Sequence, residues 1–430
     1  MESNLKRYWV MGLMCLIAWS SNGQNSTFRG QGPVNPVNTE SRPVERQWKG
    51  VFEFGNSVVS VTNDFDGARL NGMFAANDST LVGLINPENT PVNMSPWYAF
   101  KLWAPSKQSV YVRLTYGGSA RHRYHPKISK DGRAWSVLDS GNVSTEYLGI
   151  EENGRPNAVV MKLDVGPDTL WVAGQEIYSS GLVNEWMDSL TNLPYVTRES
   201  IGRSVENREM AALEIGSAQA TNLVMVICRQ HPPEVTGYLA MRTFVETVTG
   251  DTELAQEFRD KFKVFVVPLM NPDGVDNGHW RHNSSGIDLN RDWSDFNQPE
   301  TRNVRDFMHR KVKETSGEFN FGIDFHSTWD DIYYTIDSTL EGNMPGLVYS
   351  WLDGIQTEIS GYVPNVSSSD KMVPTTVSRN YFYTAFGAES LVYEIGDNTD
   401  RAFVEQKGKV AAEVLMEEML NRVEEKVAQP

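Results

Sequence analysis

The stretch "NLVMVICRQHPPE", residues 222 to 234, determines the fold class to which this chain is assigned. Its apolar part, residues 222 to 228, predicts a buried strand, because unbroken apolar runs are typical of strands covered on both faces of a parallel sheet. A polar turn follows at once, in which two prolines separate His231 from Glu234. The prolines restrict the turn, so little conformational freedom is lost if both polar side chains bind one ligand.

Three more apolar runs continue this pattern towards the C-terminus. They alternate with stretches of helical periodicity, which predicts an α/β catalytic domain over residues 185–426. We expect a mixed, mostly parallel sheet flanked by helices. The runs are "KVFVVPLM" (263–270), "FGIDF" (321–325) and "SLVYEIG" (390–396), and the helical stretches lie near 235–249, 252–262, 298–315, 343–360 and 402–425.

The preceding part of the chain has strand signals and little helical periodicity. "SVYVRLTY" (109–116) alternates apolar and polar residues, and "SKDGRAW" (129–135) carries an Asp-Gly hairpin turn. "TLWVAGQEIY" (169–178) is a further strand candidate. Residues 46–182 are therefore predicted to form an all-β sandwich domain in front of the catalytic domain.

The N-terminus has the features of an export signal. Lys6 and Arg7 precede an apolar run that is too short for a membrane span, so residues 1–23 are predicted to be a cleaved signal peptide. Cys15 leaves a lipid-anchored variant open. Residues 24–45, rich in proline, glycine and polar residues, are predicted to be a flexible linker. The mature protein would be periplasmic or extracellular, without a transmembrane segment.

Composition limits the partners. The net charge of −16 argues against a general binder of nucleic acid or of anionic membranes. Cys228 is the only cysteine beyond the signal, so the mature chain has no intramolecular disulfide and no metal site built from cysteines.

The candidate functional residues follow the predicted strands, at the sheet edge where α/β proteins place their sites. His231 and Glu234 follow the first run, and His326 follows the third. Two imidazoles and one carboxylate are suitable ligands for zinc and leave a coordination position open. His279 and His282 remain weaker alternatives. The other competing histidines are discounted, because two fall in the β-rich part and one in mid-helix; these are His122, His125 and His309.

The ordered motifs resemble those of the zinc metallocarboxypeptidases, the carboxypeptidase A-like family, over residues 190 to 425. The form "HPPE" is similar to the "HPGE" turn of the cytosolic carboxypeptidase branch, which also carries a β-sandwich before its catalytic domain. The segment "SPWYAFKLWAPSKQSVYVRLTYGG" (95–118) looks like that sandwich, here in an exported form. The family motifs are "RQHPPE", "LMNPDGVDNGHWRHNSSGIDLNRDW" (269–293), "DFHS" (324–327) and "LVYEIGD" (391–397).

The resemblance implies a role for each matching position around the metal. His231, Glu234 and His326 match the ligands of one zinc ion per chain. Glu394 matches the general base that activates the zinc-bound water.

Other matching positions are implied to bind the substrate, a peptide with a free C-terminal carboxylate. Arg281 matches the arginine that polarises the scissile carbonyl, while Asn290 and Arg291 match the pair that binds the terminal carboxylate. A guanidinium suits that group because it donates two parallel hydrogen bonds to a carboxylate. The chain departs from the carboxypeptidase A pattern at Pro233, where those enzymes carry a substrate-binding arginine.

The side-chain specificity of the site depends on the segment before Glu394. Arg379 is a candidate for binding an acidic side chain, and Tyr381 or Tyr383 for the family's substrate-capping tyrosine. A solvent-facing Arg379, with Phe382 or Phe386 lining an apolar pocket, is the alternative.

Three functions are compatible with these motifs. The first is zinc-dependent hydrolysis of a C-terminal peptide bond, and the second is amide hydrolysis on cell-wall (peptidoglycan) peptides, whose amides also precede free carboxylates. The third, a binding module without catalysis, is disfavoured because predicted ligands, base and arginine are all present.

Overall fold

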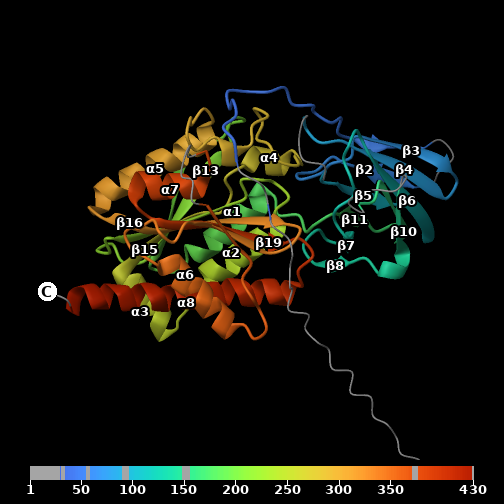
Figure 1. Cartoon of the computed structure of the whole chain (residues 1–430). Helices are drawn as coiled ribbons and strands as arrows, with labels where there is room; N and C mark the ends of the chain where they lie inside the picture. The colour runs from blue at the N-terminus through green and yellow to red at the C-terminus, as the bar shows by residue number, and fades with distance from the viewer. Residues whose placement is uncertain are drawn as a thin grey trace, which may run out of the picture.

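A mixed eight-stranded sheet forms the centre of the larger domain (Figure 1). The computed structural model describes residues 30, 34–54, 59–89, 96–147, 155–369 and 376–428. In spatial order the strands are β12 (Val196–Arg203), β13 (Glu209–Ile215), β15 (Phe262–Val267), β14 (Asn222–Cys228), β16 (Glu318–Thr328), β19 (Glu389–Gly396), β17 (Ile332–Ile336) and β18 (Val366–Ser369).

The four central strands, β15, β14, β16 and β19, run parallel. Antiparallel pairs attach β13 and β12 at one side and β17 at the other, and β18 then pairs parallel with β17. The predicted mixed sheet with flanking helices is thus confirmed. The unbroken apolar runs are buried strands, as expected, since β15 is buried at every position and β14 at all but its first.

Helices cover both faces of this sheet (Figure 1). One face packs against α2 (Val235–Val248), α3 (Glu253–Lys261), α6 (Leu347–Glu358) and α8 (Arg401–Ala428), with α1 (Ser180–Leu190) at the same core. The other face packs against α5 (Pro299–Thr315) and α7 (Ser378–Phe386), and the short α4 (Pro272–Asp276) and η2 (Leu289–Arg291) lie in the connection before α5. Neither α1 nor α7 was predicted from periodicity.

Helix α2 lies close against β16. A Cβ atom added to Gly237, in the first turn of α2, would come within 2.3 Å of the carbonyl oxygen of His326. Only glycine permits this approach, which brings the start of α2 beside the end of β16.

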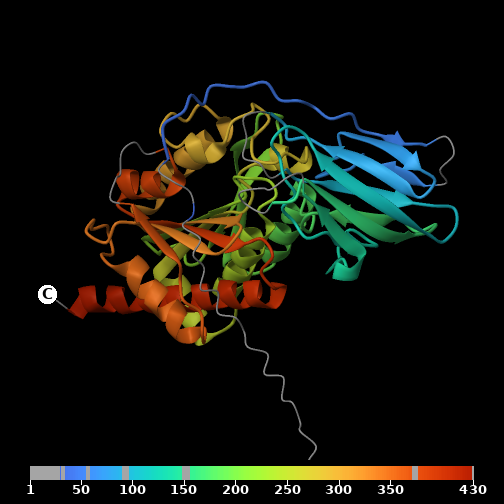
Figure 2. The ribbon, with the colours of Figure 1, turned by 45° about the vertical axis from the view of Figure 1, so that its right-hand side comes forward.

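The first domain is a sandwich of two sheets beside the larger domain (Figure 2). Their inner faces share one hydrophobic core, into which Trp280 of the larger domain also packs. The predicted hairpin is present as β7 and β8. One sheet has β1 (Val51–Phe52), β2 (Ser60–Thr62), β5 (Ala99–Trp103), β11 (Leu170–Ala173), β7 (Lys127–Ser129) and β8 (Trp135–Val137), and the other β3 (Gly72–Asn77), β4 (Thr80–Ile85), β6 (Gln108–Tyr116), β10 (Ala158–Val165) and β9 (Val143–Glu146), which follows η1 (Ser140–Asn142).

The segment before the sandwich differs from the expected flexible linker where it is described. Thr39 is fully buried, and its hydroxyl donates to Asp292 at 2.5 Å. Gln298 donates to the Thr39 carbonyl at 2.6 Å, and the backbone amide of Arg42 donates to Ser285 at 2.8 Å. Polar composition did not leave this segment free, because the larger domain satisfies its backbone groups. The signal peptide predicted over residues 1–23 lies outside the described residues.

No helix in the described part of the chain is long and apolar enough to cross a bilayer.

Candidate metal centre

The turn after β14 is held in place by polar contacts around Gln230. This buried side chain donates to Asp324 at 2.6 Å and accepts from the indole of Trp293 at 2.9 Å. Asn271 donates to the Gln230 carbonyl at 3.1 Å. The preceding Arg229 has φ +58°, a left-handed conformation that turns the chain sharply out of the strand. These contacts determine the backbone position of the next residue, His231.

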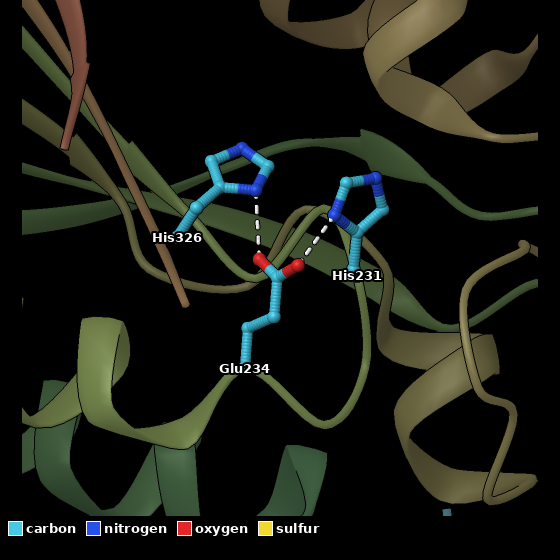
Figure 3. Close-up of side chains that lie close together, drawn as sticks. All are labelled: His231, Glu234 and His326. Atoms are coloured by element: carbon cyan, nitrogen blue, oxygen red, sulfur yellow. Dashed lines mark hydrogen bonds and ion pairs between the residues drawn. The ribbon is translucent and has the colours of Figure 1, made fainter. Parts of the chain in front are cut away.

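His231, Glu234 and His326 converge on one point (Figure 3). The Nδ1 atom of His231 lies 2.8 Å from one oxygen of Glu234, and the Nδ1 atom of His326 lies 2.7 Å from the other. All three residues are buried, and the candidate ligand atoms lie within 4.8 Å of one another. The spacing of the turn and the register of β16 thus produce the predicted three-residue cluster.

A carboxylate lies behind each imidazole. The Nε2 atom of His231 is 2.9 Å from Asp288, and the Nε2 atom of His326 is 2.9 Å from Asp324. Such outer carboxylates fix the ring orientation of metal-binding histidines and direct the other nitrogen to the metal. Two nitrogens, one carboxylate and two outer acceptors fit zinc. His231, Glu234 and His326 are therefore the residues that would hold it.

Glu394 lies beside this cluster because of strand pairing. In the parallel ladder of β16 and β19, His326 and Glu394 are direct partners, so their side chains occupy the same face of the sheet. Burial and the neighbouring Glu234 carboxylate raise the pKa of Glu394 to about 7. Its Oε2 atom is buried and has no hydrogen-bond partner among the described residues. This carboxylate is therefore available to a substrate or a water.

Asp288 also orients the arginines. Arg281 donates from Nε to Asp288 at 2.7 Å, and a terminal nitrogen of Arg291 lies 3.9 Å from the same oxygen. Burial opposes ionisation, but the two arginines and His231 hold the pKa of Asp288 well below its usual range. The amide oxygen of Asn290 accepts the backbone N–H of Ser378 at 3.0 Å, so the NH₂ group is the end of this side chain that can donate to a ligand.

One cavity of about 480 Å³ connects these groups. His231, Glu234 and Glu394 line it together with Arg281 and Asn290. Its walls come from three parts of the chain: the larger domain, the sandwich and the N-terminal segment. The lining also includes Arg42, Arg123, Arg155, Asp288, Arg291, Trp329 and Tyr334.

The structure does not bring Tyr381 to this cavity. Tyr381 is buried in the core between the sheet and α5, against Trp293 and Phe296, and its hydroxyl lies 3.1 Å from His309. The hydroxyl of Tyr383 donates instead to the carbonyl of Glu341. Tyr334, on β17, is the tyrosine that lines the cavity.

Arg379 lies behind the cavity rather than in its lining. Its Nη1 donates to the Thr335 carbonyl at 3.1 Å, and its guanidinium lies 5.7 Å from the ring centre of Tyr334. Burial lowers the pKa of Arg379 to about 10. The alternative apolar pocket is not formed either, since Phe382 and Phe386 pack in the same core as Tyr381.

The alternative histidine ligands have other partners. The Nδ1 atom of His282 lies 3.0 Å from Glu88, and that of His279 lies 2.9 Å from the His282 carbonyl. Both side chains therefore belong to the loop structure around Arg281.

Several residues of the site were not anticipated from the sequence. Asp324 stands two positions before His326 on one strand, so a period of two would have placed both on one face. Asp288 had no such signal. Arg123 and Arg155 were missed because they belong to the sandwich and reach the cavity only through domain packing.

Comparison with known proteins places this site in context. Residues 183–417 match the family model described as zinc carboxypeptidase. An uncharacterized protein of Zymomonas mobilis is 23% identical over 59% of the chain and 65% of its own length. Cytosolic carboxypeptidase 6 of Mus musculus is 26% identical over 35% of the chain and 30% of its own length. The chain thus spans less than two thirds of the length of either relative.

Solved structures support the fold. A putative carboxypeptidase A from Shewanella denitrificans superposes with a TM-score of 0.68 over 84% of the chain and 98% of that structure, at 19% identity. A metallo-carboxypeptidase from Burkholderia cenocepacia gives the same TM-score and identity over 86% of the chain and 99% of that structure. The family model begins at residue 183, but the superposition covers more of the chain than the residues from 183 onward. The shared fold therefore includes part of the sandwich.

We expect one zinc ion per chain. Replacing His326 with Ala removes one of three ligands, so purified protein should lose stoichiometric zinc in elemental analysis. His309→Ala is the matched control, because this exposed histidine contacts Tyr381 and not the cluster. Full zinc content in His326→Ala would contradict the ligand assignment.

Proposed function

Because the chain belongs to the zinc carboxypeptidase family, we propose that it hydrolyses the C-terminal peptide bond of peptides, with zinc held by His231, Glu234 and His326. One observation carries the proposal. A single cavity is lined by His231 and Glu234 of the metal-binding cluster, by the Glu394 carboxylate and by an arginine–amide pair suited to a terminal carboxylate. The last pair is what favours an exopeptidase over an endopeptidase.

A zinc ion held by His231, Glu234 and His326 would act as a Lewis acid toward the attacking water and the scissile carbonyl. Glu394 accepts the proton of that water and returns it to the leaving amine, a role open to it because its buried Oε2 atom has no hydrogen-bond partner among the described residues. Arg281 donates to the carbonyl oxygen as negative charge develops there. Its Nε is engaged by Asp288, which leaves the terminal nitrogens for the substrate.

Substrate orientation follows from the other side of the cavity. Arg291 and the NH₂ group of Asn290 bind the terminal carboxylate, because charge-assisted donors pair most strongly with that group. Cell-wall peptides that end in a free carboxylate present the same group, so they are included among the substrates to be compared.

Glu394→Gln keeps the shape of the side chain but removes the proton acceptor. We expect kcat to fall by about 10²- to 10⁴-fold, the usual cost of losing a general base. Zinc content should stay at one per chain, since Glu394 is not a ligand. Loss of zinc together with activity would show that Glu394 is a metal ligand rather than the general base.

The terminal carboxylate should be required. An amidated peptide cannot pair with Arg291, and loss of such a charge-assisted contact costs on the order of 1.5–3 kcal/mol, or about 10- to 100-fold in kcat/KM. Release of the last residue is measured by mass spectrometry on matched free and amidated peptides, and on muropeptides. Arg291→Ala should remove the difference between the two peptide forms, whereas equal rates with the unchanged enzyme would contradict the exopeptidase assignment.

The lining of the cavity favours acidic peptides. Among the residues that the structure describes, five arginines line it against three carboxylates, and a bound zinc ion would add further positive charge. The guanidinium carbon of Arg155, which belongs to the sandwich, lies 4.5 Å from the ring centre of Trp329 in the larger domain. The sequence-based expectation of an acidic preference is thus kept, but Arg155 replaces Arg379 as its proposed source.

A peptide series that differs only in its last residue tests this preference. Glu or Asp should be released faster than Leu or Phe, and Arg155→Ala should reduce the ratio of their kcat/KM values. Arg133→Ala is the control, because this arginine of the same domain forms an exposed ion pair with Glu185. Preference of the unchanged enzyme for Leu or Phe would end the proposal, and a loss of selectivity in Arg379→Ala alone would return the role to Arg379.

A further inference from the structure

A carboxylate from the sandwich holds the loop that carries Arg281. Glu88, which follows β4, is fully buried. One of its oxygens accepts the backbone N–H of Trp280 at 2.6 Å, and the other accepts those of Arg281 and His282, each at 2.8 Å. The Nδ1 atom of His282 adds a fourth contact at 3.0 Å. Three consecutive amides on one carboxylate determine both the position and the orientation of the loop.

The charge of Glu88 is supported by its surroundings. Burial alone would raise the pKa of this carboxyl, but the hydrogen bond from His282 and the nearby His279 and Arg69 hold it below its usual range. Arg69 is itself buried and donates from Nε to the Gly278 carbonyl at 2.7 Å. An ionised carboxylate is the form that accepts all four contacts, because it carries acceptors on both oxygens.

A second contact holds the far end of the same loop. The side-chain amide of Asn89 donates to the Gly286 carbonyl at 3.1 Å. Neighbouring residues of the sandwich therefore bind the loop on both sides of Arg281. The side chain of Arg281 then needs only its hydrogen bond to Asp288 to be directed into the cavity.

We propose that Glu88 is a positioning residue for the reaction, through which the β-sandwich sets the place of Arg281 relative to the scissile carbonyl. The inference rests on the proposed role of Arg281 as a donor to the developing oxyanion. Such a donor is sensitive to small displacements, since a shift of about 1 Å can cost about 10²-fold in rate.

A purely structural contact between the domains is the competing explanation, and the chain offers a matched control for it. Glu176, at the end of the sandwich, forms a two-pronged ion pair with Arg401 at the start of α8, at 2.8 and 2.9 Å. Glu176→Gln weakens the joint between the domains without touching the loop of Arg281.

Glu88→Gln places an NH₂ group against backbone N–H donors, so the loop must shift. We expect kcat to fall by about 10²-fold with KM changed less than about twofold, because the lost interaction belongs to the transition state. Zinc content should stay at one per chain. Glu88→Asp, which keeps the charge on a shorter side chain, should recover part of kcat, and Glu176→Gln should retain full kcat.

A double-mutant cycle decides the matter. In the Arg281→Ala background, Glu88→Gln should lower kcat by less than about twofold, because the residue it positions is gone. Three results would overturn the inference. The first is an unchanged kcat in Glu88→Gln, and the second is an equal fall of kcat in Glu176→Gln. The third is a double variant whose fall in kcat equals the product of the two single falls. If Glu88→Gln does not fold, Glu88→Asp is taken through the same cycle. A normal kcat in Arg281→Ala alone would instead refute the proposed role of Arg281.

Discussion

The site depends on the parallel register of three strands, β14, β16 and β19. Parallel strands end at one edge of a sheet, so whatever follows each strand meets there. Pairing of β16 with β19 puts His326 opposite Glu394, and the turn after β14 brings His231 and Glu234 to the same edge. A shift of one residue would turn one member of the pair to the opposite face. The hydrophobic burial of the central strands therefore also fixes the arrangement of the polar groups.

Burying so many ionisable groups is costly unless each has a partner. Asp324 and Asp288 accept from the outer nitrogens of the two histidines, and Asp288 also pairs with Arg281. These contacts direct one nitrogen of each imidazole to a common point, which is the arrangement that a metal ion requires. The Oε2 atom of Glu394 has no such partner among the described residues, and burial together with the nearby Glu234 carboxylate raises the pKa of Glu394. A bound cation would lower this pKa by supplying the missing positive charge.

The sandwich contributes to the site as well as to the fold. Its inner core accepts Trp280, and Glu88 binds the backbone on both sides of the next residue, Arg281. Arg123, from the same domain, reaches the cavity and pairs with Asp397 at 2.6 Å near the end of the central sheet. Together with the N-terminal segment around Thr39, these contacts make the cavity a joint product of the domains.

Local pattern in the sequence determined the central strands, most flanking helices and the metal cluster. The apolar runs had to be buried strands, and the spacing of His231 and Glu234 on one short turn required no knowledge of distant contacts. Tertiary structure alone decided the edge strands, α7, and the lining of the cavity. Tyr381 shows the reason: it was one of two candidates for the family's substrate-capping tyrosine, but packing against Trp293 holds it in the core, and the tyrosine that lines the cavity, Tyr334, comes from β17. Which side chain faces a cavity depends on long-range packing, and no local period of the sequence records it.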